Sequence, residues 1–332
     1  GCGSAAHSSG ERLELDDPLP ASPPPTTKLV IGDPTTQKAL ELSGEIDRIS
    51  FDVEWANMSG GPQTTEAFRA NALDLGSVAD IPPIQAKWTG LDVKIVAAKF
   101  RKDPIGHPVY RLGIAPGVSV KKLSDLRGKR IAFSPGQAQG ALVLRVLRKA
   151  GLAKSDVDLV ELPSTGDVYP NALANKQVDV APLGGTALRR YLAEYGPDGA
   201  SAIEHGIRDD PAHLYTQVST LQDPGKAAAI REYVELWARA QQWIVDHPDE
   251  WIQGYYVEKE GLTPEDGAYL VEEAGDFDIP ARWDDVIDRH QKTIDLLSTE
   301  TGRERFDAEE LYDRRFESVA ADALAAYTKG GE

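Results

Sequence analysis

The chain has 332 residues, 41% of them apolar, and carries 53 acidic against 36 basic side chains, for a formal net charge of −17. This length exceeds what one hydrophobic core usually organises, so we expect two lobes. The acidic balance argues against nucleic acid or an anionic membrane surface as the main partner. No run approaches the roughly 20 apolar residues of a membrane span.

The N-terminal segment contains the only cysteine, Cys2, which excludes internal disulfides and thiolate metal clusters. The small and polar residues around Cys2 are similar to the start of a bacterial lipoprotein after removal of its signal peptide. We therefore expect Cys2 to be lipidated and the protein to be extracytoplasmic, anchored to the cell membrane. Residues 1–27 hold five prolines and no hydrophobic period, so they predict a tether, a disordered or extended linker.

From residue 28 onward, strand patterns alternate with helix patterns. The apolar run 28–32 predicts a strand, and the polar turn 33–37 leads into a helix. The following elements are expected in this order: a strand over 49–55, a helix over 64–71 capped by Thr64 or Thr65, a strand over 73–77, a helix after 78–83, and a strand over 93–98.

The second half of the chain continues the alternation before it becomes helical. Residues 111–115 and 214–220 are extended runs. Between them we expect strands over 130–133, 158–162 and 177–181, and helices around 142–150 and up to Leu173. Beyond 220 the apolar periods predict helices, one stopped by His247-Pro248 and one capped by Thr263 ahead of Pro264.

The turn over 134–140 is the most informative stretch for function. It is small and polar, and it lies between a predicted strand and the start of a helix, whose free N–H groups favour an anion. Most strand–turn–helix units bind nothing, however. The turn is neither a Walker loop nor a G-x-G-x-x-G fingerprint, so it does not establish a site by itself.

A weak internal repeat suggests that this turn has a counterpart in the first half. Residues 29–40 match 131–142 in layout, and 70–77 match 174–181. Ligands of open α/β sheets bind beyond the carboxyl ends of the strands. Two such lobes facing each other would therefore place four loops around one cleft, although any α/β chain yields some look-alikes of this kind.

Several motifs, in this order and spacing, resemble a known family. They are residues 61–67, 73–84, 123–133, 147–152 and 177–180. They resemble the periplasmic substrate-binding proteins of ABC transporters, in the aliphatic sulfonate, taurine and nitrate group. The resemblance implies an α/β, two-lobed periplasmic-binding-protein fold of type II with two crossover hinge segments, fitted by 111–115 and 214–220. Lobe I would be 28–112 plus 214–332, and lobe II 113–213.

The resemblance also implies a ligand site between the lobes. Its expected residues are Thr35, Thr36, Gln37, Ser77, Val78, Ala79, Ser134, Gly136, Gln137, Ala138, Gln139, Asp179, Gly184 and Gly185. Ser134 and the amides of Gln137 to Gln139 would hold an acidic head group, and Thr36, Gln37 and Ser77 would add donors. We expect Asp80 to cap its helix, since it would repel an anion, or to pair with a cationic amine.

Two departures from the family pattern concern the ligand. The sequence has Gly136-Gln137-Ala138 where sulfonate binders usually carry a hydroxyl pair, and it has 182–185 where they carry an aromatic residue. Fewer hydroxyls weaken the case for a small oxyanion. The missing aromatic residue leaves room for a bulkier group.

The function expected from these observations is a solute-binding receptor of an ABC importer, without enzyme activity and without a cofactor. It would capture a small organic anion, an aliphatic sulfonate or related compound, by lobe closure. Its partners would be the solute, the ABC permease in the membrane and a lipid anchor, and it would act as a monomer. Taurine, nitrate or a pyrimidine or aromatic precursor are alternative solutes.

An enzyme or a sensor domain on the same fold are the alternatives to a transport receptor. Against an enzyme, the folded body has no cysteine to carry a covalent cofactor, and no G-x-S-x-G elbow is present. The sequence also shows no metal-ligand spacing among its histidines beyond the tether, which are His107, His205, His213, His247 and His290.

Overall fold

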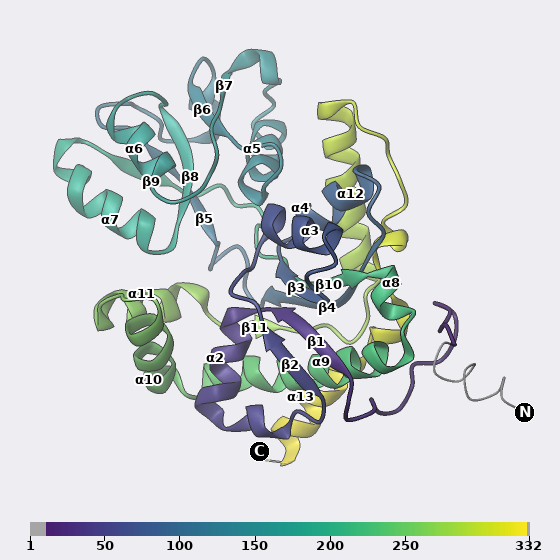
Figure 1. The fold of residues 1–332 in the computed structure, drawn as a ribbon. Helices are drawn as coiled ribbons and strands as arrows, with labels where there is room; N and C mark the ends of the chain where they lie inside the picture. Colours follow the sequence, from purple (N-terminus) through teal and green to yellow (C-terminus); the bar gives the residue numbers. More distant parts are fainter. Residues whose placement is uncertain (1–10, 331–332) are drawn as a thin grey trace, which may run out of the picture.

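The computed structural model describes residues 11–330 and has two lobes, each built around one sheet (Figure 1). The first sheet contains β1 (Lys28–Gly32), β2 (Asp52–Trp55), β3 (Leu75–Val78), β4 (Val93–Arg101), β10 (Ala212–Gln217) and β11 (Phe277–Asp278). The second contains β5 (Tyr110–Ile114), β6 (Arg130–Phe133), β7 (Asp158–Glu161), β8 (Val180–Gly184) and β9 (Ser201–Ile203). Cys2, the expected lipidation site, lies outside the described residues.

Helices surround both sheets (Figure 1). Those before the second crossover are α2 (Pro34–Ser43), α3 (Gly61–Arg69), α4 (Ile81–Trp88), α5 (Ala138–Lys149), α6 (Val168–Ala174) and α7 (Gly185–Tyr195). The later ones are α8 (Val218–Leu221), α9 (Pro224–Asp246), α10 (Pro248–Trp251), α11 (Pro264–Ala274), α12 (Asp284–Thr301) and α13 (Val319–Gly330), with a π-helical segment at Ile252–Lys259.

Both sheets mix parallel and antiparallel pairs. Their strand orders are β11-β4-β10-β3-β1-β2 and β7-β6-β8-β5-β9. In the first, β1 runs parallel to β2 and β3, while β10 is inserted antiparallel between β3 and β4. In the second, β6 runs parallel to β7 and β8, and β5 is antiparallel to β8. This two-lobed α/β architecture confirms the predicted fold class.

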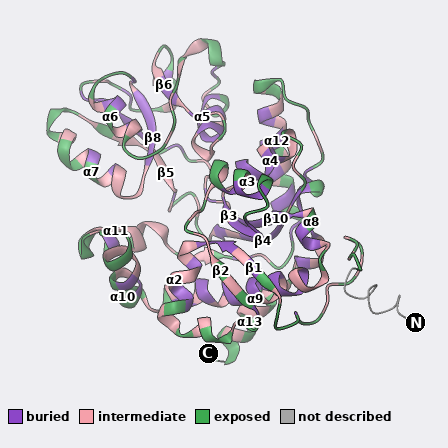
Figure 2. Cartoon of the chain, viewed as in Figure 1, coloured by how far each residue is buried: buried purple, intermediate pink, exposed green. Residues whose placement is uncertain are grey.

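The alternation of side chains along each strand divides the core of the second lobe into two clusters. Ile131 and Val180 pack with α5 residues such as Leu142 on one face of the second sheet. Their neighbours Ala132 and Ala181 pack with helix residues on the other face. The sheet is therefore covered by helices on both faces, with the exposed residues on the outer sides of those helices (Figure 2).

The predicted internal repeat has a physical counterpart in both lobes. A carboxylate oxygen of Asp74 accepts the backbone N–H of Val30 at 2.8 Å, and one of Asp179 accepts that of Arg130 at the same distance. Each contact joins the residue ahead of one parallel strand to the backbone of the strand beside it. These matching contacts hold the two pairs of parallel strands, β1 with β3 and β6 with β8, in the same arrangement.

Several element boundaries differ from those expected. Helix α3 begins at Gly61, three residues before the predicted cap, because Pro62 fits its first turn. Thr64 lies inside that helix, where its hydroxyl donates to Gly60 O. Strand β8 covers 180–184 rather than 177–181, since the backbone before it is used by the turn of α6.

The chain crosses between the lobes at 102–109 and again at 204–211. Each crossing comes just before the extended run that we expected to be the crossover, because β5 and β10 are themselves sheet strands. The Asp209 carboxylate accepts the N–H groups of Val109 and Tyr110, both at 2.8 Å, and Asp210 accepts that of Arg101 at 2.7 Å. These two adjacent carboxylates hold the crossovers side by side.

Residues 11–27 differ from the disordered linker that composition predicted. They form no helix or strand, but the N–H of Leu13 donates to Gln222 O at 2.7 Å. Arg315 donates to the carbonyls of Glu14 and Asp17, and Leu15 and Leu19 pack against the core of the first lobe. Proline-rich composition does not reveal this docking because the partners lie far away in sequence.

None of the helices within residues 11–330 is long and apolar enough to cross a membrane. The longest, α9, has 23 residues, with Pro224 in its first turn and Asp223 as its cap. It packs against α2 and α13 on one side of the first sheet (Figure 1). Its apolar residues belong to the core of the first lobe rather than to a membrane segment.

Replacing Asp209 with Ala tests the link between the crossovers. The substitution leaves the N–H groups of Val109 and Tyr110 without their acceptor, so the free energy of unfolding should fall by about 1–3 kcal/mol in urea titrations. Asp198→Ala, at an exposed position, is the matched control and should change it by less than about 0.5 kcal/mol. Equal effects of the two substitutions would contradict this role.

Candidate functional site

A cavity of about 810 Å³ lies where the two lobes meet. The first lobe contributes Thr35, Ala79 and residues of β4, and the second contributes Tyr110 and Ala138. Residues 244–277, which include α10, the π-helical segment and α11, complete its wall. Its volume is in the usual range for small-molecule sites, roughly 300–1,000 Å³.

Three of the residues expected at the ligand site line this cavity: Thr35, Ala79 and Ala138. They come from the ends of β1 and β3 and from the start of α5, so the structure brings loops of both lobes together. The Thr35 hydroxyl lies 3.2 Å from the Tyr255 hydroxyl of the π-helical segment. The other residues that we expected at the ligand site do not line this cavity.

Other residues of the first lobe's loops support the site without lining the cavity. Asp33 caps α2 by accepting the N–H of Thr36, whose side chain is buried, and the N–H of Gln37 donates to Asp33 O. The Ser77 carbonyl accepts the N–H of Gly60, and Val78 is buried. Their polar atoms thus hold the ends of β1 and β3 in place.

The turn over 134–140 is built differently from what we expected. The Ser134 hydroxyl is 4% exposed; it donates to Leu162 O at 2.8 Å and is hydrogen-bonded to Tyr169. The Gln137 side chain accepts from the N–H and hydroxyl of Ser164. The Ser134 hydroxyl, which we expected to help hold an acidic head group, thus forms its hydrogen bonds inside the lobe.

The donors that remain available to a ligand at residues 134–140 are N–H groups at the start of α5. The N–H groups of Gly140 and Ala141 donate to Gln137 O, whereas Ala138 and Gln139 stand at the helix start, where N–H groups have no partner in the preceding turn. Gly136 is exposed, and an added Cβ would meet no atom within 4 Å. Gly140, which was not among the expected residues, instead permits the close approach of the helix to the turn.

Asp179 does not belong to the cleft. It directly precedes β8 and so lies at the opposite end of that strand from Gly184. Its carboxylate pairs with the Arg130 guanidinium at 3.0 Å. Arg130 and these hydrogen bonds lower the pKa of Asp179 despite the cost of its partial burial. Gly184 and Gly185 lie at the other end of β8, where a Cβ on Gly184 would overlap Val109 O of the crossover.

Asp80 is not the helix cap that we expected. Its side chain makes no capping hydrogen bond to α4; it pairs instead with Arg145 of α5 at 3.3 Å and is buried. Arg145 is also hydrogen-bonded to Thr293 of α12. This ion pair joins the two lobes.

Sequence reasoning missed the cation of the cleft, Lys99. Lys99 is on β4, lines the cavity, and donates to the Gln241 side chain at 2.7 Å. Burial lowers its pKa to about 8, an effect that the nearby Asp33 partly offsets. No carboxylate within residues 11–330 forms an ion pair with Lys99. The available signal was a lysine within the otherwise apolar run 95–100.

The second basic residue of the cleft is already engaged. The Arg101 guanidinium donates to the carbonyls of His107 and Pro108, both at 2.9 Å. It therefore holds the first crossover, and Lys99 is left as the cation with donor capacity to spare.

Aromatic residues of the segment after α9 form the apolar wall. Trp251 and Tyr255 stack with ring centroids 4.4 Å apart, and Tyr256 packs edge-on against Tyr255. All three line the cavity. The aromatic wall that the sequence lacks after β8 is thus supplied by the first lobe, and the four-residue spacing of Trp251 and Tyr255 was its signal.

No group of three or more His, Cys, Asp or Glu side chains in residues 11–330 is placed to hold a metal ion. The cleft thus combines Lys99, the engaged Arg101, helix-start N–H groups, an aromatic wall and four carboxylates, of which Asp209 and Asp210 are hydrogen-bonded to the crossover. Such a set can bind an anionic head and an apolar body.

Comparison with protein families matches residues 50–251 to the family described as NMT1/THI5 like. The chain belongs to the NMT1/THI5-like family. The match covers β2 through α10 and so includes the second lobe, about half of the first lobe, both crossovers and Lys99. The segment with Tyr255, Tyr256 and α11 lies beyond it.

One relative is the aliphatic sulfonates-binding protein of Escherichia coli (strain K12), with 36% identity over 105 residues. The match spans 32% of this chain and 32% of that relative, so only about a third of the relative's length is matched.

Among solved structures, the periplasmic aliphatic sulphonate binding protein SsuA from Escherichia coli has a TM-score of 0.71 and 20% identity, covering 87% of this chain and 92% of that one. The desulfurization enzyme DSZB has a TM-score of 0.60 and 16% identity, covering 89% and 99%. At these identities both likenesses concern the fold. They show that the fold is shared by a binding protein and an enzyme.

The turn over 134–140 can be tested with two glycine substitutions. In Gly140→Ala, the new Cβ would overlap Ser134 O, so we expect the free energy of unfolding to fall by about 1–3 kcal/mol in urea titrations. In Gly136→Ala, the Cβ meets open space, and the change should stay within about 0.5 kcal/mol. If Gly140→Ala were as stable as Gly136→Ala, the close approach of α5 to its preceding turn would be disproved.

Proposed function

We propose that this protein is the extracytoplasmic solute-binding receptor of an ABC importer and captures a small organic anion, an aliphatic sulfonate or a related compound, between its lobes. The observation that carries the proposal is Lys99, a half-buried ammonium in the cleft without an ion-pair partner in the described residues, whose pKa is lowered by desolvation. An unpaired buried charge is costly, and a bound anion would remove that cost. The family and the named relatives support the same function.

The rest of the cleft suits an organic anion better than a small inorganic one. Trp251, Tyr255 and Tyr256 offer an apolar wall to the body of the ligand. The N–H groups at the start of α5, near Ala138, offer donors to its head group, favoured by the helix dipole. We propose that Thr35 and Ala79 complete the contacts from the first lobe.

Closure of the lobes would couple binding to transport. Asp266 of α11 pairs with Arg189 and Arg190 of α7 at 3.4 and 3.5 Å, and Arg111 of β5 pairs with Glu273 at 3.2 Å. These exposed or partly exposed pairs are weak individually. A ligand that touches both lobes would therefore decide how far the closed arrangement is populated.

The permease partner, the monomeric state and membrane anchoring through Cys2 are parts of this proposal. Because residues 11–27 dock on the first lobe, only the residues before 11 would separate the anchor from the folded body. A chain of nine residues spans at most about 30 Å. The receptor would therefore stay close to the membrane surface, where its permease lies.

We propose binding without catalysis, although DSZB shows that the fold also supports an enzyme. The only cysteine of this chain is Cys2, far in sequence from every residue that lines the cleft. The cleft lining contains no serine. Its hydroxyl groups are those of Thr35, Tyr110, Tyr255 and Tyr256, and burial raises the pKa of each of these three tyrosines, which makes them poorer nucleophiles.

Isothermal titration with butane-1-sulfonate tests the proposed ligand class. Lys99→Met removes a charge-assisted hydrogen bond, so the dissociation constant should rise by about 10- to 100-fold. Lys121→Met, an exposed position, removes the same charge and should leave the constant unchanged. No binding of butane-1-sulfonate by the unmodified protein would reject the sulfonate assignment, and binding that is indifferent to Lys99→Met would reject its role as the cleft cation.

The affinity should also depend on pH. The anion favours the protonated ammonium, and the pKa of Lys99 is lowered to about 8, so affinity should be constant below pH 8. Above pH 8 the dissociation constant should rise about tenfold per pH unit, until the pKa of the complex is reached. The sulfonate itself stays ionised throughout. Titrations of Lys99→Met from pH 6 to 10 should show no such change, and an equally flat profile for the unmodified protein would contradict the assignment.

A further inference from the structure

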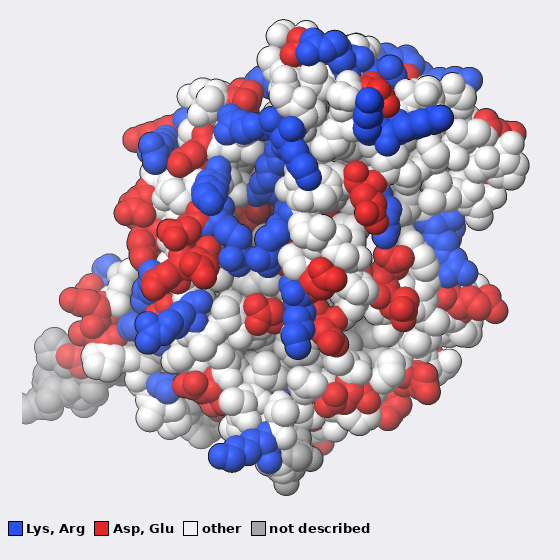
Figure 3. All heavy atoms as spheres, turned by 180° about the vertical axis from the view of Figure 1, so that it is seen from behind, with Lys and Arg blue, Asp and Glu red and all other residues white. Residues whose placement is uncertain are grey.

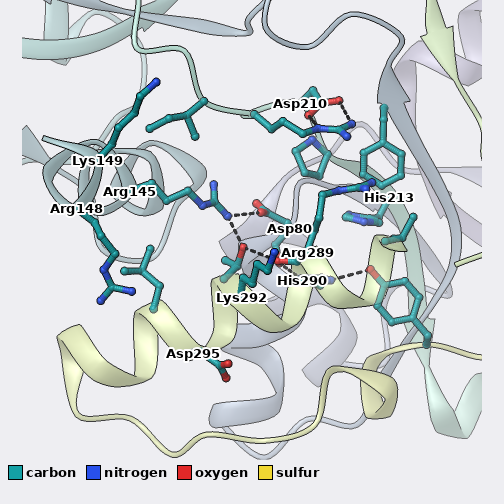
Figure 4. Close-up of a pocket in the computed structure, with 18 residues that line it drawn as sticks. Asp80, Arg145, Arg148, Lys149, Asp210, His213, Arg289, His290, Lys292 and Asp295 are labelled. Carbon is teal, nitrogen blue, oxygen red and sulfur yellow. Dashed lines mark hydrogen bonds and ion pairs between the residues drawn. The ribbon is translucent and has the colours of Figure 1, made fainter. Parts of the chain in front are cut away.

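A second cavity, of about 660 Å³, lies behind the hinge between α5 and α12 (Figure 4). It shares Phe100, Asp210 and Pro211 with the cleft, so the crossover forms a common wall between the two cavities. On this side of the molecule, Lys and Arg side chains gather around a hollow (Figure 3). Such a cluster is unexpected on a chain with a net charge of −17.

Six cations line this rear cavity against three carboxylates. The cations are Arg145, Arg148, Lys149, Arg208, Arg289 and Lys292. The carboxylates are already paired: Asp80 with Arg145, Asp210 with Arg208 at 3.0 Å, and Asp295 with Arg305 at 2.7 Å. Arg148 is paired with Glu300 at 3.4 Å, outside the lining, so the surplus of positive charge rests on Lys149, Arg289 and Lys292.

Arg289 and Lys292 contribute most to this surplus. Neither forms an ion pair within residues 11–330, and both project from α12 toward the cavity (Figure 4). Arg289 and Arg208 both lie over the Phe100 ring, at 4.9 and 5.5 Å from its centroid. Burial and the neighbouring Arg208 lower the pKa of Arg289. The two guanidinium groups repel each other; Asp210, which pairs with Arg208, reduces this repulsion, and a further anion would reduce it more.

The wall of the rear cavity has an apolar part. Phe100, Val286 and Leu296 line it and are buried, and Ile207 adds to the same surface. The cavity is much larger than a sulfate or phosphate ion needs. An occupant that fills it would place an apolar or aromatic body on these residues and its charges on the surrounding cations.

We propose that this rear cavity binds a small organic polyanion with an apolar body, bridging α5 of the second lobe, α12 of the first lobe and Arg208 of the second crossover. The bound anion would hold together the two lobes behind the hinge, beside the Asp80–Arg145 pair. This proposal does not rest on the proposed function of the cleft.

Benzene-1,3,5-tricarboxylate is a suitable probe, titrated calorimetrically into the full chain at an ionic strength kept constant with NaCl. We expect saturable binding, with benzoate and propane-1,2,3-tricarboxylate each binding at least about tenfold more weakly, because one lacks charges and the other lacks the ring. Absence of saturable binding, or equal affinity for all three compounds, would overturn the proposal.

Variants locate the probe. Arg289→Met keeps an apolar side chain over Phe100 and should weaken binding of benzene-1,3,5-tricarboxylate by about 10- to 100-fold, and Lys292→Met, at an exposed position that does not endanger folding, by about tenfold. Lys121→Met is the control for a general loss of charge, and Lys99→Met the control for the cleft; both should keep the affinity.

An effect of Lys121→Met as large as that of Lys292→Met would show general charge attraction and overturn the proposal. Loss of binding in Lys99→Met alone would place the probe in the cleft and would also overturn the proposal. The outcome is separate from that of the sulfonate titrations. Those test the cleft with butane-1-sulfonate and Lys99, whereas benzene-1,3,5-tricarboxylate and Lys292 test the rear cavity.

Discussion

The structure depends on two adjacent carboxylates at the hinge. The chain passes between the lobes twice, and Asp209 and Asp210 accept backbone N–H groups from Val109, Tyr110 and Arg101, which belong to or flank the other crossover. Crossover segments have few backbone partners of their own, so these bonds determine how the two sheets are oriented. The cleft lies on one side of this junction and the basic rear cavity on the other.

Because one wall serves both cavities, the two sides of the hinge are physically coupled. Phe100 carries two arginines on its rear side, while its neighbour Lys99 on β4 serves the cleft. Alternation along a strand sends neighbouring side chains to opposite faces. A single strand thus supplies an apolar platform to one cavity and a cation to the other, and a ligand in either cavity would contact the wall that the two cavities share.

The sequence predicted the repeated framework well, because that framework rests on local patterns. Strand periodicity, proline in first turns and glycine past helix ends are properties of neighbouring residues. The matching Asp74 and Asp179 contacts show that the internal repeat is real. The same regularity explains the place of Asp179: like Asp74 in the first lobe, it precedes a parallel strand and binds the backbone of the strand beside it.

The sequence by itself determined the α/β class, the division into two lobes and the family. It also indicated that the loops after β1, β3 and β6 line the cleft. Only the tertiary structure decided which atoms of these loops remain free. Ser134 is used by Leu162 and Tyr169, whereas Lys99 is left unpaired among the described residues, and neither outcome is visible from neighbours in sequence. These side chains form their hydrogen bonds with partners that are distant in sequence. The composition of a loop therefore shows which donors it contains, and the fold decides which of them a ligand can reach.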